Sequence, residues 1–417
     1  MPPPTLPDGF LPRRWGGNSD DRCDGWPPDR PGDGRVMTEA TAHLFIDVLD
    51  LETGAREDYW HVGELAHELG IRGILNRLVA SRMPPASGGE RVYSVLWYET
   101  LMEARVDLGR LLDGHSIPYF VFKGGALLSA QYTTGDVRMV DLDVLVPLRE
   151  KERTAVAFEA AGWPKRAAAG DPALFGAPGE VFARPVTDDA ISWVDMDVHW
   201  RVAPVERLFP WRGEPLPDDV WRSAVHRGGT PMPRPCHHAA LLVHHLVRHD
   251  LLHFRGVFDL VQLWPLLRVP DESRAFSSLA VSLGVSRVAG RLCCTLQTDL
   301  ALEPLATRAP RHSSARGPAE LQSVRSLIAL SLDASDKDFE TVTVPRAIRR
   351  LRTVDRVLRT SLTLLTEALA PPDEYLRWRW PGANTPMRRI RHLGRVFTRL
   401  IDDESTLPPT EDLSETR

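Results

Sequence analysis

The sequence predicts an α+β fold in which a small mixed sheet is flanked by helical segments on either side in the chain. Apolar residues recur at helical spacing before Ile117 and again after Cys236. Between these regions, short apolar or alternating runs bounded by turn residues are typical of strands, at 118–122, 140–146 and 191–200. The change of period along the chain therefore predicts a sheet core between two helical parts.

Composition and periodicity also predict where the segments begin and end. The start of the chain is rich in Pro, Gly, Asp and Arg and has no apolar periodicity, so we expect disorder there. A helical pattern opens at Met37, which makes a misassigned start codon a plausible hypothesis. We expect, in order, a disordered start at 1–36, a helical N-terminal segment at 37–116, a core at 117–230, a helical C-terminal domain at 236–400 and a disordered tail at 401–417.

Charge and cysteine content narrow the class of protein. The 417 residues include 56 acidic and 51 basic side chains, which argues against a general nucleic-acid binder. None of the four cysteines forms a C-x-x-C pair, so neither a disulfide framework nor a zinc ribbon is indicated. No stretch approaches the roughly 18 unbroken apolar residues of a membrane span. We expect a cytoplasmic protein with no membrane partner.

The stretch from Pro118 to Pro147 carries the clearest chemistry. It reads as a strand, a glycine pair at Gly124 and Gly125, a short apolar helix, and a second strand that contains Asp141 and Asp143. Residues two apart on a strand share a face, so the two aspartates project together. Adjacent carboxylates repel each other unless a cation compensates, and Mg²⁺ prefers a few carboxylates plus phosphate oxygens.

This order of elements resembles the nucleotidyltransferase superfamily typified by DNA polymerase beta. More narrowly, Lys123-Gly124-Gly125, then Arg138, then the run 141–146, is similar to the family of uncharacterised nucleotidyltransferases. The resemblance covers roughly residues 93–399, and it implies transfer of a nucleotide at a magnesium centre.

The residues around the glycines have alternative roles. Gly124 and Gly125 either let a backbone approach the donor's phosphates or simply make a tight turn. Lys123 pairs either with a phosphate or with an aspartate when metal is absent. Arg138 contacts either phosphate or the aspartates.

A third carboxylate is expected from the strand 191–200. Asp195, Asp197 and His199 alternate there with apolar residues and therefore share one face. Two-metal sites hold their ions about 3.5–4 Å apart, so the carboxylates must come from neighbouring strands. The resemblance places the third carboxylate at Asp197, with Asp195 as the competing candidate.

A histidine-rich helix after Cys236 offers a different metal chemistry. His245 and His249 lie on one helical face, and with Asp250 and Asp259 they would supply an HD-type phosphohydrolase. The alternative is a polar helix face that lines the catalytic cleft together with His199. The resembled family also carries such a histidine and a later aspartate, which His245 and Asp259 match best.

We therefore predict a nucleotidyltransferase that moves a nucleoside monophosphate from an NTP, such as ATP, to an unidentified acceptor: a small molecule, a peptide, a tRNA or a protein. Asp141 and Asp143 would hold Mg²⁺ on the donor phosphates, and Asp197 would hold a second ion and help deprotonate the acceptor. The HD-type hydrolase and a catalytically idle nucleotide-binding or protein-interaction module remain as alternatives.

Overall fold

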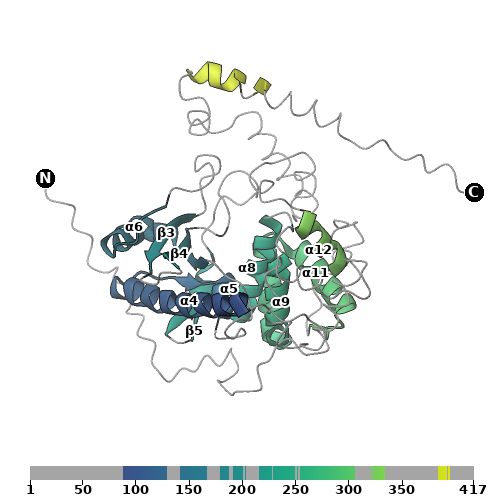
Figure 1. Ribbon diagram of the computed structural model, residues 1–417. Coiled ribbons are helices and arrows are strands. Elements are labelled where there is room, and N and C mark those ends of the chain that lie inside the picture. The colour runs from purple at the N-terminus through teal and green to yellow at the C-terminus, as the bar shows by residue number, and fades with distance from the viewer. Residues whose placement is uncertain are drawn as a thin grey trace, which may run out of the picture.

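The computed structural model describes the central part of the chain and a short C-terminal helix (Figure 1). Predictions for Arg138, His249 and Asp250, for the two chain ends, and for the segment before residue 88 lie outside the described residues. The described residues are 88–128, 141–166, 179–186, 191–200, 202, 216–227, 229–248, 251, 254–305, 321, 323–333, 384–391 and 393–394.

A four-stranded mixed sheet forms the centre of the fold, with strand order β1-β2-β4-β3. Its strands are β1 (Phe120–Val121), β2 (Asp141–Leu145), β3 (Gly179–Pro185) and β4 (Trp193–His199). The β2 and β4 strands run parallel, whereas β1 and β3 pair antiparallel at the two edges. A separate two-stranded sheet consists of β5 (Val225–Arg227) and β6 (Thr230–Met232). The predicted α+β class with a small mixed sheet is confirmed.

Helices precede, interrupt and follow the sheet (Figure 1). Among the described residues, no helix combines the length and the apolar composition that a membrane span requires. The helices are α4 (Gly88–Gly114), α5 (Lys123–Leu127), the 3-10 turn η2 (Leu148–Glu150), α6 (Lys151–Ala160), α7 (Asp218–Arg222), α8 (Pro235–Arg248), α9 (Phe254–Leu267), α10 (Pro270–Ser282), α11 (Ser286–Asp299) and α12 (Val324–Asp333).

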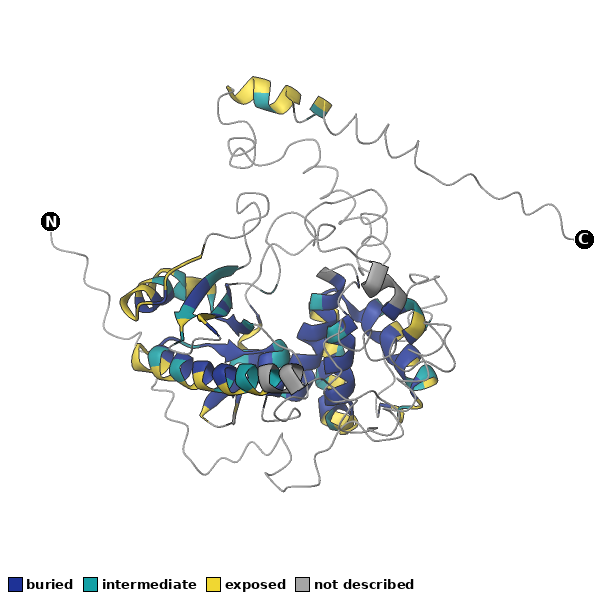
Figure 2. Cartoon of the chain, viewed as in Figure 1, coloured by how far each residue is buried: buried dark blue, intermediate teal, exposed yellow. Residues whose placement is uncertain are grey.

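One face of the sheet is apolar along β2 and β4 and packs on α4 and α6. Leu142 and Val144 from β2 are fully buried there, as are Met196 and Val198 from β4. They meet buried residues of the two helices, among them Phe158. In Figure 2 dark blue prevails on the strands behind α4, whereas α4 itself alternates dark blue with teal and yellow. Burial of this face fixes the register of both strands, because a one-residue slip would turn every apolar side chain outward.

The other face is divided between apolar packing and polar side chains. Leu145, at the end of β2, joins Phe120 and Phe122 in the core formed by the C-terminal helices. Helices α8 and α9 pack side by side in that core (Figure 1). Asp143 lies two residues before Leu145 on the same face. This face therefore changes from polar at Asp143 to apolar at Leu145, where β2 meets the core of the C-terminal helices.

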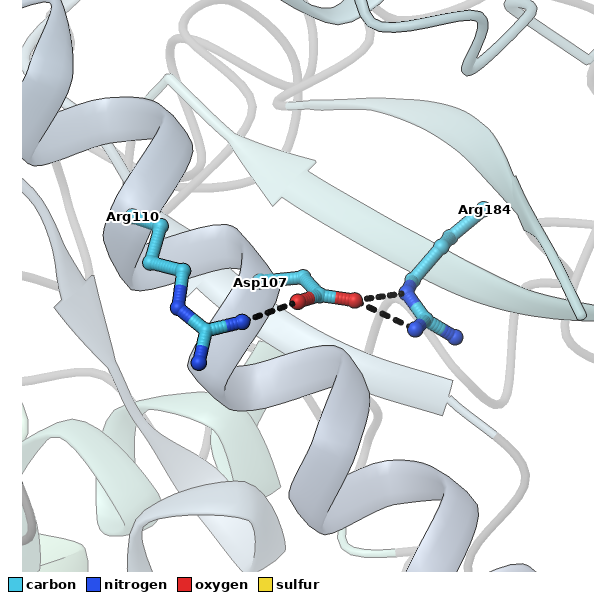
Figure 3. A network of polar contacts seen from close by, with 3 residues as sticks. All are labelled: Asp107, Arg110 and Arg184. Carbon is cyan, nitrogen blue, oxygen red and sulfur yellow. Dashed lines mark hydrogen bonds and ion pairs between the residues drawn. The ribbon is translucent and has the colours of Figure 1, made fainter.

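An ion-pair network ties α4 to the edge strand β3. Asp107 of α4 accepts a hydrogen bond from Arg110 Nη1 at 3.1 Å and one from Arg184 Nε of β3 at 3.0 Å, with a second contact from Arg184 Nη2 (Figure 3). The forked geometry of the guanidinium suits a carboxylate well. This network anchors the sheet edge beside the apolar face.

Candidate functional site

Two acidic strands lie next to each other with their carboxylates aligned. In the parallel pair β2–β4, Asp141 is opposite Asp195 and Asp143 is opposite Asp197. The intervening apolar residues of both strands are fully buried on the opposite face, so the four acids share one face. Neighbouring strands are about 4.8 Å apart, which brings carboxylates in register close together.

His199 connects the acids of the two strands. Its Nε2 lies 3.1 Å from Asp143 Oδ1 and 2.9 Å from Asp197 Oδ2. The ring of Phe122 packs edge-on against the imidazole, with the two centroids 5.2 Å apart. Burial disfavours the charged ring, but the carboxylates of Asp197 and Asp143 outweigh it and raise the pKa of His199 above its ordinary value. One ring nitrogen of His199 therefore contacts both carboxylates and holds them in place.

Lys123 is a second basic side chain at the carboxylate of Asp143. Its Nζ lies 2.5 Å from Asp143 Oδ1, and only 15% of its side chain is exposed. The residue lies two positions after the end of β1 and begins α5 with a φ of +51°, in the left-handed region that side-chain-bearing residues rarely adopt. This turn directs the Lys123 side chain at the acidic strands.

Asp141 completes the acidic row at the start of β2. Burial and the charge of Asp143 raise the pKa of Asp141 to about 7, although Lys123 opposes the shift. A carboxylate so close to other negative charges is a group that a bound divalent ion would stabilise.

Three side chains of this face can hold a metal ion together. Asp143, Asp197 and His199 each place a ligand atom within 4.8 Å of the other two, and among the described residues they form the one group of three or more metal-binding side chains of this kind. Oxygen donors suit Mg²⁺ or Mn²⁺, and an imidazole suits transition ions. The donor set therefore fits a divalent metal ion.

Asp195, the competing third carboxylate, is engaged elsewhere. Arg166 Nη1 donates to its Oδ1 at 2.7 Å and to its Oδ2 at 2.9 Å. The guanidinium carbon of Arg166 also lies 4.9 Å from the centroid of the Trp193 ring. Asp197, by contrast, lies in the group with Asp143 and His199. The geometry thus favours Asp197 over Asp195 as the third carboxylate.

The glycine pair lies inside α5 rather than in a turn before it. Gly125 is buried, and a Cβ there would approach Leu142 Cδ1 to 2.7 Å and Val121 Cγ1 to 2.9 Å. Close packing of α5 on the strands accounts for the glycine at this position. Gly124 is only half-buried and lies next to Lys123.

The helix α8 distributes its histidines among separate surroundings. His245 is half-buried, and Asp259 of α9 is buried in an ion pair with Arg255 Nε at 3.0 Å. Asp259 also influences His238 electrostatically. Burial lowers the pKa of His238 to about 4, although Asp259 and the backbone of Lys123 favour its charged form. Within the described residues, His245 and Asp259 belong to no group of three metal-binding side chains.

Sequence reasoning missed Arg166 and His238 and gave His199 only a place in the cleft. Arg166 carries no motif, because it reaches Asp195 through a chain segment whose backbone pairs with β3, from Arg166 N to Val181 O at 2.9 Å. The role of His199 was visible in the alternation of β4, which puts its ring on the same face as Asp197.

Acidic residues on two neighbouring strands lie beside a Lys-Gly-Gly segment in an α+β core, which is the arrangement that the sequence resemblance predicts. Residues 94–298 match the sequence profile of the family described as "Uncharacterised nucleotidyltransferase". The match confirms the resemblance drawn from Lys123 to Val146.

A solved structure, described as an antigenic nucleotidyltransferase-like protein from Paracoccidioides brasiliensis, is also similar. It shares 12% identity and a TM-score of 0.31, over 55% of this chain and 100% of that one. At that TM-score the similarity adds nothing to the fold assignment. No curated protein matches the chain.

Proposed function

We propose that the protein transfers a nucleoside monophosphate from an NTP to an acceptor hydroxyl, phosphate or amine, with pyrophosphate leaving, at a Mg²⁺-dependent centre on β2 and β4. One observation carries the proposal: Asp143 and Asp197 face each other in register and share His199. This pairing lies within the residues that match the nucleotidyltransferase family.

In this proposal the carboxylates of Asp141, Asp143 and Asp197 hold the metal. A bound divalent ion would neutralise phosphate charge and make the acceptor hydroxyl easier to deprotonate. His199 orients the oxygens of Asp143 and Asp197 through its Nε2 contacts. The side chain of Asp197 is 30% exposed and that of Asp143 is 11% exposed, so Asp197 is the carboxylate open to an incoming acceptor.

The donor's triphosphate is assigned to the segment beside β1. Lys123 places an ammonium next to Asp143. Donor phosphates that are bound through the metal ion at that carboxylate would lie within reach of this ammonium. The half-buried Gly124 and the buried Gly125 would let the phosphates lie close to the α5 backbone, and Arg138 would contribute a further positive charge. The described cysteines are all free, which favours the reducing cytoplasm as the compartment.

Calorimetric titration of the full chain with ATP or CTP in the presence of Mg²⁺ tests the proposal. We expect Mg²⁺-dependent binding by the wild type, and a loss of about tenfold or more in Asp143→Asn, because a metal ligand is removed. Asp195→Asn is the matched control: it removes one charge from the same sheet face but leaves the metal group intact.

Equal losses in both variants, or none in Asp143→Asn, would contradict the assigned centre. Incubation with labelled NTP and cell extract then tests transfer and reveals the class of acceptor. Tight binding without transfer of label to any extract component would support the idle nucleotide-binding module instead.

A further inference from the structure

Two basic side chains contact one oxygen of Asp143. Lys123 Nζ lies 2.5 Å from Oδ1, the same atom that His199 Nε2 approaches at 3.1 Å. Mg²⁺ binds a carboxylate oxygen at about 2.0–2.1 Å. An ammonium group in contact with that oxygen would repel the ion strongly, since charges a few ångström apart interact by several kcal/mol near a protein surface. A divalent ion that binds Asp143 at Oδ1 therefore has to displace Lys123.

Displacement of Lys123 is costly unless the ammonium finds a new partner. Its side chain is 15% exposed and that of Asp143 is 11% exposed, so neither group is well hydrated. A charged group that loses its partner in such surroundings is destabilised, because water does not replace the interaction. The phosphates of a nucleotide would offer the ammonium a new anion within reach of its flexible stem.

The position of Lys123 is fixed by its neighbours rather than left to chance. Its backbone holds the left-handed φ of +51°, which is unfavourable for a residue with a side chain and persists only where the surroundings impose it. Phe122, the preceding residue, packs edge-on against His199, and its ring centroid lies 5.4 Å from Lys123 Nζ. The turn is thus anchored on the same centre that the ammonium neutralises.

We propose that Lys123 is a built-in counter-ion of Asp143, which gives up its place when a divalent ion and a nucleotide triphosphate bind together. This inference rests on the proposed function, since it describes regulation of the same centre. The ion alone binds weakly, because it has to displace Lys123 without compensation. The nucleotide raises the affinity for the ion, and by linkage the ion raises the affinity for the nucleotide by the same factor.

The test measures Mn²⁺ binding to the full chain by electron paramagnetic resonance, with and without the non-transferable analogue α,β-methylene-ATP. In Lys123→Met we expect Mn²⁺ alone to bind about tenfold more tightly than in wild type, and the analogue to bind about tenfold more weakly in saturating Mn²⁺. If the affinity for Mn²⁺ rises and the affinity for the analogue falls, Lys123 pairs with Asp143 before the ligands bind and with the nucleotide phosphates afterwards.

Lys165→Met is the matched control for the loss of one positive charge. Lys165 pairs with Glu180 at 2.8 Å, and Glu180 lies opposite Val198, a residue of the apolar face. Both affinities should change less than about twofold in this variant, because the Lys165 side chain is 51% exposed and Glu180 keeps a second partner, Lys151 Nζ, at 3.0 Å. Lys123→Gln serves as a second variant, and thermal unfolding checks that each variant is folded.

The outcomes separate the two proposals. If both Lys123 variants bind Mn²⁺ alone no more tightly than Lys165→Met does, the counter-ion role is wrong, even where Mn²⁺ and nucleotide still bind together to the wild type. If the wild type binds no Mn²⁺ in the presence of the analogue, the proposed function itself fails.

Discussion

The strand pair β2–β4 and the helix α8 are both rich in metal-binding side chains, yet only the strands bring such side chains together among the described residues. Residues two apart on a strand share a face, so the acids and His199 meet at one place. On α8, His237 and His238 are neighbours in sequence and therefore point in different directions. His237 lies 3.1 Å from Ser223 Oγ, whereas His238 faces Asp259 and the backbone of Lys123.

The same difference appears in the pKa shifts of the imidazole rings. Burial lowers the pKa of His237 and of His238, so both are neutral at neutral pH. His199 is just as buried, yet its pKa is raised, because Asp197 and Asp143 favour its charged form. Burial of a histidine therefore does not by itself determine the direction of its pKa shift. The direction depends on the charged groups that the buried ring contacts.

The largest effect that we expect from this comparison is a loss of transfer activity when a carboxylate on β2 is replaced. Asp141→Asn and Asp143→Asn should each reduce transfer of label from NTP by roughly a thousandfold, since such electrostatic terms are commonly worth several kcal/mol in the transition state. The amide keeps nearly the same shape, so the packing of Leu142 and Val144 behind β2 should persist. Single-turnover assays with thermal melting measure both effects.

His237→Gln on α8 is the control for that experiment. It changes a buried polar side chain of the helix and should leave transfer within a few-fold of wild type. Equal activity of Asp143→Asn and His237→Gln would show that the chemistry does not lie on the strands.

A smaller effect is expected in the pH dependence of stability without added metal. The pKa of Asp141 is raised from an ordinary value of 3.8 to about 7, so in the folded protein it binds a proton that the unfolded chain releases. Its contribution to stability is therefore fully present below about pH 4 and is lost as the pH rises to about 7. Denaturant unfolding of the wild type should show this loss.

In Asp141→Asn that part of the slope should disappear, and the variant should be more stable than the wild type at pH 7 in the presence of a chelator. Saturating Mg²⁺ with ATP should reverse the order, because the ligands stabilise only a protein that binds them. A wild type and variant with parallel pH profiles would mean that Asp141 is not held among like charges.

Several parts of the site could be predicted from the sequence because they follow from a period of two. The shared face of Asp141 and Asp143, and that of Asp197 and His199, needs only the alternation along each strand. Which strands pair, and in what register, depends on contacts between distant segments. The register that places Asp143 opposite Asp197 can therefore be seen only in the structure.

Other features of the site depend on contacts between segments that are distant in the sequence, so the sequence alone could not predict them. The preference for Asp197 over Asp195 arises from Arg166, whose approach to Asp195 no local pattern signals. The glycine at 125 looked like a device for phosphates, whereas it also fits the space beside Leu142. A glycine motif cannot distinguish close approach to a ligand from close approach to a neighbouring strand, because both need the absence of a side chain.

The smallest effect expected is that of His245→Ala, which sharpens the contrast between helix and strands. His245 lies on α8, outside the group of metal-binding side chains formed by the described residues, so its loss should change Mn²⁺ affinity in the presence of nucleotide by less than about twofold. His199→Ala is the matched histidine on β4. It removes the contacts that orient Asp143 and Asp197 and should weaken Mn²⁺ binding by about ten- to a hundredfold. Metal titration of the two variants under the same conditions gives the comparison directly. The reverse order, with a transition metal that copurifies with the wild type and is lost from His245→Ala, would place the metal chemistry on the helix and favour an HD-type hydrolase.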